Sequence, residues 1–229
     1  MSEYVAVLSG SGLSAESGLP TFRDAAGLWN QYSWRDLASP DGWREHPELV
    51  LAFYNERRAK AWAAKPNAAH LAIASLEKSF NVVVITQNVD NLHERAGSTK
   101  VLHLHGELAC ARGTGPSRHR VRIDGAPIVL GQKCAEGSQL RPDIVWFGEE
   151  TQHMDEAREA VAAADKVLVV GTSLTVYPAA GLVEFARPGA EKVLNALDMD
   201  ELPAGFEFLA GPATSVIPEI TERWSRAHR

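Results

Sequence analysis

The sequence predicts an α/β protein built on a Rossmann-like, doubly wound parallel sheet, with a smaller lobe formed by two insertions. Three observations lead to this fold class: short apolar runs, helical stretches between those runs, and two segments that break the alternation. The 229 residues are enough for one good-sized domain or for one domain with an inserted module. We therefore expect one structural unit rather than a string of domains.

The strands are predicted by five runs that are nearly all apolar and rich in Val, Ile and Leu. Each run has about the length of a strand and is bounded by Gly, Asn, Ser or Thr. Continuous rather than alternating hydrophobicity is typical of strands buried on both faces, as in a parallel sheet. The runs are residues 4–8, 82–85, 101–104, 167–170 and 193–197.

The helices are predicted by longer stretches between these runs, in which apolar residues recur with helical spacing. Strands that alternate with helices indicate βαβ units and a doubly wound sheet. The helical stretches are residues 47–64, 67–79, 154–164 and 178–187.

Two segments break the alternation. The first, from about residue 28 to 66, is helical and rich in Trp, and the second, from about 109 to 147, is rich in Gly and Arg. The second contains an Asp124–Gly125 turn between two apolar triplets, 121–123 and 128–130, which predicts a hairpin. We expect a small lobe of residues 28–66 and 109–147, and a large domain of residues 1–27, 67–108 and 148–229.

Composition excludes several classes. The formal net charge of −6 argues against a general nucleic-acid binder, so the basic stretch 118–122 is interpreted as a solvated hairpin face. No apolar run is long enough for a transmembrane helix, and no basic region precedes the first apolar run. Two cysteines make no disulfide framework. We expect a cytoplasmic protein.

A glycine-rich segment, residues 9–18, follows the first apolar run. Glycines at a strand-to-helix junction let the backbone approach a pyrophosphate. By itself the Gly10-Ser11-Gly12 spacing is weak evidence, because a purely structural turn uses glycine in the same way.

Polar residues also follow three other apolar runs: Thr86 to His93, His103 to Glu107, and Gly171 to Val176. Asn88 and Asp90 are either ligand-binding residues or the cap and first-turn acid of a helix. Alternation along a strand would place His103 and His105 on one face, and a strand-end histidine beside a glycine suits a general base. Four polar loops indicate a dinucleotide pocket. It differs from the dehydrogenase type, because the third glycine and the later acidic residue are missing.

Taken together, these motifs resemble the sirtuin family of NAD-dependent protein deacylases over essentially the whole chain. The resemblance rests on the ordered segments 10–24, 87–90, 105–108, 141–149, 171–174 and 178–181. It implies a large NAD-binding domain, NAD as a co-substrate, and transfer of an acyl group from lysine to ADP-ribose with release of nicotinamide.

The resemblance also implies roles for individual residues. The catalytic group would be His105 with Asn88 and Asp90, His105 being the general base on the ribose hydroxyls. NAD would be bound by Gly10, Ser11, Gly12, Ser14, Ala15, Thr21, Phe22, Arg23, Trp29, Gln87, Asn88, Asp90, His105, Gly171, Thr172, Ser173, Asn195 and Ala213. The acyl-lysine peptide would pair by β-augmentation with a strand of Val145, Trp146 and Phe147, followed by Gly148.

The acyl preference is predicted from a helical pair. Tyr54 and Arg57 lie three residues apart and share one face, where a phenol and a guanidinium would bind a carboxylate. The pair resembles that of sirtuins that remove succinyl, malonyl or glutaryl groups. A half-buried Tyr beside an exposed Arg is the structural alternative.

The chain departs from the family at the zinc site. Sirtuins usually have two Cys-x-x-Cys pairs, whereas here Cys110 is followed by Gly113 and Cys134 by Gly137. Two thiolates do not supply the four ligands of a closed structural site, and the spacing of His103 or His119 demands neither as a ligand. We predict that zinc is absent and assign no metal ligand. Cys110 and Cys134 could then lie close enough to form a disulfide on oxidation, which the cytosol disfavours.

Smaller departures lie near the cofactor. Ser11 stands where the family usually has alanine, and Asn195 appears shifted by one residue from the family's adenosine contact. The sequence favours a monomeric deacylase of acidic and acetylated lysines in protein substrates. NAD hydrolysis or ADP-ribosyl transfer in the same pocket is the alternative, and a non-catalytic NAD sensor is disfavoured because His105 and Asn88 are present.

Overall fold

The computed structural model describes residues 3–21 and 33–228, and its large sheet contains all five predicted strands. The sheet is parallel throughout, with the order β3-β2-β1-β7-β8-β9. In chain order this is 3-2-1-4-5-6, the Rossmann order, which reverses between β1 and β7. The strands are β1 (Tyr4–Ser9), β2 (Asn81–Thr86), β3 (Val101–His103), β7 (Lys166–Val170), β8 (Glu191–Ala196) and β9 (Glu207–Ala210).

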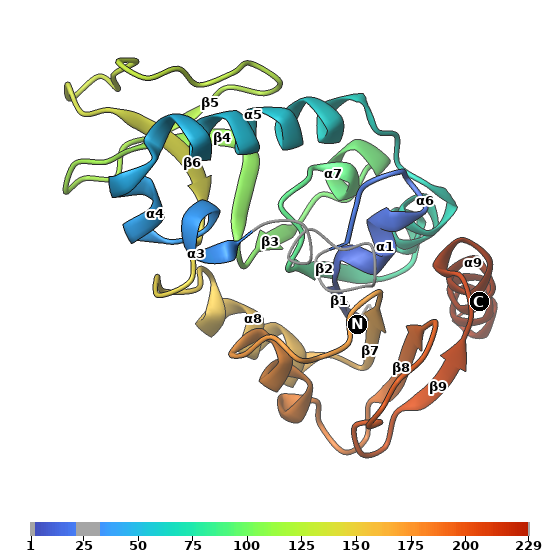
Figure 1. Cartoon of the computed structure of the whole chain (residues 1–229). Helices are drawn as coiled ribbons and strands as arrows, with labels where there is room; N and C mark the ends of the chain where they lie inside the picture. The colour runs from blue at the N-terminus through green and yellow to red at the C-terminus, as the bar shows by residue number, and fades with distance from the viewer. Residues whose placement is uncertain (1–2, 22–32, 229) are drawn as a thin grey trace.

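Helices cover both faces of this sheet, as the continuous apolar strands require (Figure 1). On β1, Val5 and Val7 face one side and Ala6 and Leu8 the other, because successive strand side chains alternate. The Val5 side packs against α6 (Ala68–Ser75), η1 (Leu76–Lys78) and α9 (Ala213–Ala227). The Ala6 side packs against α8 (Met154–Ala163) and η2 (Ala179–Phe185). The predicted doubly wound fold class is confirmed.

A second, antiparallel sheet has the order β5-β4-β6. Its strands are β4 (Gly106–Gly113), β5 (Arg120–Arg122) and β6 (Leu140–Ile144), and it packs with α3 (Trp34–Leu37), α4 (Pro40–Glu45) and α5 (Pro47–Ala63). In Figure 1, α5 runs alongside β4 and β6, apart from the large sheet. The short helices α1 (Ser11–Ala15) and α7 (Leu92–Ala96) begin near the carboxyl ends of β1 and β2.

The predicted hairpin is wrong in its second strand. Residues 120–122 form β5 and pair with β4, but 128–130 form no strand. The side chain of Asn55 on α5 hydrogen-bonds to both backbone groups of Ile128. Its Nδ2 donates to the Ile128 carbonyl at 2.8 Å, and its Oδ1 accepts from the Ile128 amide at 2.9 Å. A tertiary contact therefore replaces the expected strand pairing.

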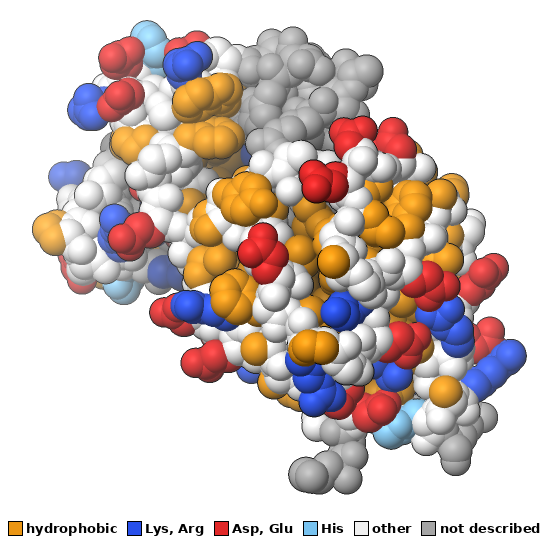
Figure 2. All heavy atoms as spheres, turned by 90° about the horizontal axis from the view of Figure 1, so that it is seen from below, with side chains coloured by type: hydrophobic (Ala, Val, Ile, Leu, Met, Phe, Trp, Pro, Cys, Tyr) orange, Lys and Arg blue, Asp and Glu red, His pale blue; other side chains and the backbone are white. Residues whose placement is uncertain are grey.

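None of the described helices is both long and apolar enough to cross a membrane. On the face shown in Figure 2, acidic and basic side chains of the coloured residues are interspersed rather than gathered by sign.

Candidate active site

The site forms at the topological switch point, where the loop after β1 meets the loop after β7. The Gly12 amide donates to the Gly171 carbonyl at 2.8 Å, and the Gly10 amide donates to the Val170 carbonyl at 3.0 Å. A Cβ atom on Gly10 or Gly12 would lie 2.7 Å or 2.9 Å from the Gly171 carbonyl oxygen. Such distances are sterically excluded, so glycine is needed at both positions. Open α/β sheets bind their ligands at this edge.

Asn88 lies in the loop after β2 and connects that loop to the glycine segment by hydrogen bonds. Its side-chain nitrogen donates to the Gly10 carbonyl at 3.0 Å and to the Ser14 hydroxyl at 3.2 Å. Ser14 in turn donates to the Asp90 carboxyl at 3.1 Å, and Asp90 also accepts from the Leu92 amide at 3.1 Å. Asp90 precedes the N-cap of α7, Asn91, so it is not the first-turn acid that the structural alternative expected, although it accepts from the first amide of the helix; Asn88 does not cap that helix.

Burial governs the charge of Asp90. Desolvation raises its pKa above the ordinary value, although the hydrogen bonds from Leu92 and Ser14 oppose this shift. The Asp90 carboxyl is therefore a weaker acid than a solvent-exposed aspartate.

His105 lies in the turn between β3 and β4, because β3 ends at His103 rather than continuing as the alternation assumed. Its Nδ1 lies 3.2 Å from the Gln87 carbonyl oxygen, which only accepts, so Nδ1 carries the proton and Nε2 the lone pair of the neutral ring. Burial lowers the pKa of His105 from its ordinary value, and the Gln87 bond only partly opposes this. The ring is a neutral base at pH 7.

His103 has a different environment. Its Nδ1 contacts the Asn88 carbonyl at 2.9 Å and its Nε2 contacts Glu94 at 2.8 Å. Burial lowers the pKa of His103, but the bond to Glu94 and its charge outweigh burial and raise the pKa overall. Glu94, His103 and Glu107 have ligand-type atoms within 4.8 Å of one another, but Glu107 is ion-paired with Arg120. Ion pairs account for this cluster.

A cavity of about 510 Å³ joins the glycine segment to the long helix α5. Its walls bring together predicted cofactor and acyl residues that are far apart in sequence, among them Ser11, Ser14, Ala15, Asn88, Asp90 and Arg57. Val89 and Leu108 form part of its apolar lining.

The predicted acyl pair lies beside this cavity. The guanidinium carbon of Arg57 lies 5.5 Å from the ring centre of Tyr54, which confirms that the two side chains share a face of α5. Burial lowers the pKa of Arg57, while Tyr54 and Asp90 oppose the shift. Tyr54 is itself buried, and burial raises the pKa of its phenol despite the nearby Arg57. Tyr54 is thus a neutral phenol next to a cation.

The predicted peptide-pairing strand is not formed by residues 145–147, because β6 ends at Ile144. The Trp146 amide donates to the Glu149 carboxylate at 2.9 Å, which turns the chain after the strand. Trp146 is only 2% exposed and points inward, whereas Phe147 is 41% exposed. The Val145 amide binds the His105 carbonyl at 2.9 Å, so this segment is attached directly to the histidine turn. Gly148 follows with a φ of +90°.

Glu149 holds residues 145–148 in place through two ion pairs. Its carboxylate pairs with Arg112 at 2.8 Å and with Arg141 at 2.9 Å, and all three groups are largely buried. Burial raises the pKa of Glu149, but the Arg141 bond and charge outweigh it, so the pKa is lowered. The Arg141 guanidinium carbon also lies 3.2 Å from the Trp146 ring centre.

At the other end of the predicted cofactor site, Gln87 donates to the Thr172 hydroxyl at 3.3 Å, and Ser173 is exposed beside it. Asn195 is 1% exposed, and its amide binds the carbonyls of Leu209 at 2.8 Å and Gly211 at 3.0 Å. Asn195 therefore shapes the loop that leads to Ala213.

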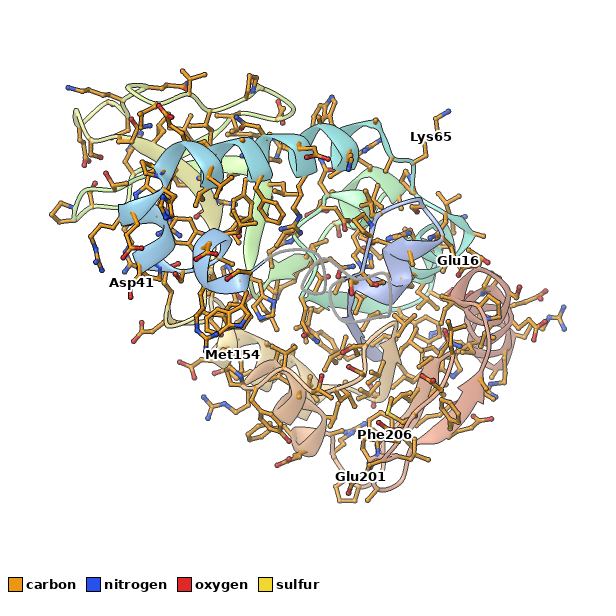
Figure 3. All side chains as sticks on the ribbon, in the orientation of Figure 1. Glu16, Asp41, Lys65, Met154, Glu201 and Phe206 are labelled. Carbon is orange, nitrogen blue, oxygen red and sulfur yellow. The ribbon has the colours of Figure 1, made fainter. Side chains whose placement is uncertain are left out.

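Glu16, which projects from the end of α1 in Figure 3, accepts from the Thr214 amide at 3.0 Å. This bond fixes the start of α9, where Ala213 is buried, to the glycine segment. Thr21 is the last described residue before a gap, and Phe22, Arg23 and Trp29 lie outside the described residues.

The two cysteines are free thiols in separate environments. Cys134 packs with Ala111 and contacts the Ser138 hydroxyl at 3.2 Å. Cys110 precedes Ala111 on β4 and so points to the opposite face, where the charges of Glu107 and Arg120 act on it. A Cβ on Gly113 would lie 3.0 Å from the Cys134 sulfur, so the glycine lies close to this thiol.

A Rossmann-ordered sheet with two hydrogen-bonded glycine loops at its switch point, a neutral histidine in the turn after β3 and a cavity beside the first glycine loop defines a dinucleotide-binding α/β protein. The model of the Sir2 family matches residues 10–178. The chain belongs to the Sir2 family, the sirtuins, as its motifs predicted.

Two curated relatives are each called an NAD-dependent protein deacylase. One, from Bacteroides thetaiotaomicron, is 49% identical over 82% of this chain and 82% of its own. The other, from Shewanella oneidensis, is 41% identical over 97% of this chain and 94% of its own. Both matches span more than four-fifths of this chain and of the relative.

Solved structures agree in fold. A Sir2 homologue mutant bound to ADP-ribose has a TM-score of 0.91 and 39% identity, covering 99% of this chain and 93% of that one. A Sir2 protein with a deacetylated p53 peptide and 3′-O-acetyl-ADP-ribose has a TM-score of 0.77 and 31% identity, with coverages of 99% and 94%.

Proposed function

We propose that this protein is an NAD-dependent protein-lysine deacylase that releases nicotinamide and forms O-acyl-ADP-ribose. The observation that carries the proposal is the neutral His105, whose Nδ1 is bonded to Gln87, the residue before Asn88 of the Asn88–Ser14–Asp90 cluster, which leaves Nε2 as the basic nitrogen. The names of the full-length relatives support the same activity. The substrates would be acyl-lysine proteins.

The cavity suits NAD as a substrate. A phosphate group approaches the backbone closely only where side chains are absent. Gly10, Gly12 and Gly171 provide such positions, because a Cβ atom on each would clash with neighbouring atoms. Asn88 and Asp90 present an amide and a carboxyl from the cavity wall to sugar hydroxyls. Bound NAD would supply an electrophilic C1′ with nicotinamide as its leaving group, and the acyl-lysine oxygen would supply the nucleophile.

The chain's own contribution is proton transfer and positioning. His105 Nε2 would accept a proton from a ribose hydroxyl, while the Gln87 carbonyl holds the opposite nitrogen in the donor form. Asn88, held between Gly10 and Ser14, would keep the sugar aligned. The remaining predicted NAD contacts, including those outside the described residues, are part of this proposal.

We further propose that acidic acyl groups, succinyl and malonyl, are preferred, with acetyl also removed. Arg57 places a cation on the cavity wall, and Tyr54 lies beside it with a neutral phenol. A carboxylate there would receive charge-assisted hydrogen bonds that an acetyl group does not make.

An acyl-peptide panel tests both parts. With NAD and a succinyl-lysine peptide, mass spectrometry should detect O-succinyl-ADP-ribose. Nicotinamide release at the same rate without peptide would contradict deacylation and favour NAD hydrolysis or ADP-ribosyl transfer. Tyr54→Phe and Arg57→Met should each lower desuccinylation at least about 10-fold more than deacetylation, since a bond to a charged group is worth about 1.5–3 kcal/mol.

Arg44→Met is the control in the neighbouring helix α4. Arg44 is exposed, is paired with Asp41 at 2.5 Å and does not line the cavity, so the succinyl-to-acetyl ratio should change less than about 2-fold. Equal loss of both activities in Tyr54→Phe and Arg57→Met would mean that the pair shapes the cavity without selecting a carboxylate.

We also propose that the small lobe, residues 28–66 and 109–147, is stable without zinc, in a monomeric cytoplasmic protein. Glycines at 113 and 137 replace two ligands, and the Arg112–Glu149–Arg141 network joins β4 to the chain after β6. Elemental analysis should find less than one zinc per ten chains, and a chelator should leave the melting temperature unchanged. Stoichiometric zinc would overturn this part.

A further inference from the structure

Trp146 makes a buried hydrogen bond that the peptide-binding role of its neighbours does not explain. Its indole Nε1 lies 3.1 Å from the Tyr54 hydroxyl oxygen. An indole nitrogen only donates, so the Tyr54 oxygen is the acceptor. The phenolic hydrogen therefore points away from Trp146, and no described residue accepts it.

This hydrogen is therefore available to the acceptor of a ligand that Arg57 would bind. The residues share one face of α5, and the Arg57 guanidinium carbon lies 5.5 Å from the Tyr54 ring centre. Arg57 lines the cavity together with Val89 and Leu108, and these two pack in the same apolar cluster as Tyr54 and Trp146. A bond received by a hydroxyl oxygen also strengthens the bond that its hydrogen donates.

Trp146 is itself held rigidly. Arg141 stacks on its ring at 3.2 Å, Trp43 packs at a centroid distance of 5.8 Å, and its backbone amide is bound by Glu149 at 2.9 Å. The indole position is thus set by the segment 145–148, which also binds the histidine turn through Val145.

We infer that Trp146 is a specificity-determining residue for acidic acyl groups: its indole orients the Tyr54 hydroxyl so that the hydroxyl donates to a carboxylate held by Arg57. This inference rests on the proposed acidic-acyl preference. Residues 145–148 would then act on the acyl group as well as on the peptide, because Trp146 points inward to Tyr54 at the acyl end of the site.

The test is a double-mutant cycle read as the ratio of kcat/KM for a succinyl-lysine peptide to that for the matching acetyl-lysine peptide. Trp146→Phe keeps an aromatic ring and removes the donor, so the ratio should fall about 3- to 10-fold, the effect of one hydrogen bond. In a Tyr54→Phe background the same change should alter the ratio less than about 2-fold, because Trp146 then has no hydroxyl to orient.

Trp224→Phe is the matched control. It removes an indole bond of 2.6 Å from α9 to Glu191 on β8, and neither residue lines the cavity, so the ratio should stay within about 2-fold of wild type. Equal losses of both activities in Trp146→Phe, or multiplicative losses in the double variant, would overturn the inference. Absence of desuccinylation in the wild type would instead overturn the acidic-acyl preference itself.

A direct measurement covers the case in which Trp146→Phe does not fold. In the ¹⁵N-labelled wild type, the Trp146 indole resonance should shift on Tyr54→Phe substitution and again on addition of a succinyl-lysine peptide, but much less with the acetyl-lysine peptide. An indole resonance that is insensitive to Tyr54→Phe would mean that the bond is not formed in solution, and the inference would fail.

Discussion

The backbone amide of Gly12 donates to the carbonyl oxygen of Gly171 at 2.8 Å, which locks the loop after β1 onto the loop after β7. Gly171 adopts a φ of +65° to offer this carbonyl, and its own Cα faces Gly12. The proposed phosphate-binding surface is therefore made by two chain segments about 160 residues apart. Its geometry depends on the absence of side chains at both.

Gly12→Ala should separate these loops. The new Cβ would lie 2.9 Å from the Gly171 carbonyl oxygen, so backbone has to move. We expect a loss of about 1–3 kcal/mol in the free energy of unfolding and at least about a 10-fold weaker NAD affinity by calorimetry. Gly189→Ala, where nothing lies within 4 Å of the added Cβ, is the control and should change neither quantity appreciably. Unaltered NAD binding in Gly12→Ala would contradict this account of the site.

His105→Asn should stop catalysis while sparing binding. Asparagine can still donate to the Gln87 carbonyl but has no basic nitrogen, so O-acyl-ADP-ribose formation should fall about 10²- to 10⁴-fold. NAD affinity should stay within about 3-fold of wild type by calorimetry, since the positioning residues are untouched. A variant that keeps a tenth of wild-type product formation would exclude His105 as the general base.

The pH dependence of the reaction follows from the same ring. Burial lowers the pKa of His105, and a base acts only when unprotonated, so activity is present above the folded-state pKa and is lost as the pH falls through it. A profile of kcat/KM from pH 5 to 9 should therefore be level around pH 7 and decline below the ordinary histidine value of about 6.5. An acidic limb centred above pH 7 would mean that another group is titrating.

The strands that position the site could be predicted because they are buried on both faces. A run such as Val82 to Ile85 has no polar residue, and this alone places it inside a covered parallel sheet. Strand β9 differs in this respect. It lies at the sheet edge and has four residues, of which the first and last are exposed and the middle two are half-buried, so no continuous buried run marks it.

Helix α9 is not among the helices predicted from the sequence, although its signal is present. Ala213, Ile217, Ile220 and Trp224 recur at helical spacing and are all buried, but Pro218 interrupts the stretch. The hairpin prediction failed because the partner of Ile128 is a distant side chain, Asn55. Periodicity contains no information on such a contact.

The candidate site was predictable where residues follow strand ends, as with Gly10, Asn88 and Gly171. It was not predictable where the outcome depends on which way a side chain turns. Val145-Trp146-Phe147 reads as a uniform apolar run, yet Trp146 is buried and Phe147 is exposed. The carboxylate that causes this turn, Glu149, is recognisable only once Arg112 and Arg141 are seen to surround it.

His70 should make the fold acid-sensitive. It is fully buried, and burial lowers its pKa to about 4 from the ordinary 6.5. Between these two values the His70 ring is protonated in the unfolded chain but not in the folded chain. Its contribution to stability is therefore present above pH 6.5 and declines as the pH falls toward 4. This residue alone should remove about 2 kcal/mol of the free energy of unfolding between pH 7.5 and pH 5.

His70→Gln isolates that contribution. His70 is the third residue of α6, in a capping box with Asn67, and glutamine preserves such a box without titrating. Urea unfolding at pH 7.5 and pH 5 should show a smaller acid loss in the variant than in the wild type. Equal losses would assign the acid sensitivity to other groups, among them the buried His93 next to it.

Glu149→Gln should loosen residues 145–148, the segment that we propose binds the acyl peptide, without touching the glycine loops. The change leaves the buried guanidinium groups of Arg112 and Arg141 without their shared anion, and breaking a buried ion pair in this way typically removes about 3–5 kcal/mol. The Trp146 amide also loses its carboxylate partner, so the KM for an acyl peptide should rise more than the KM for NAD. Glu156→Gln, at an exposed pair with Lys100, should change stability by less than about 1 kcal/mol. If both KM values rose equally in Glu149→Gln, the network would support the whole lobe rather than this segment, because only a local loosening separates peptide binding from NAD binding.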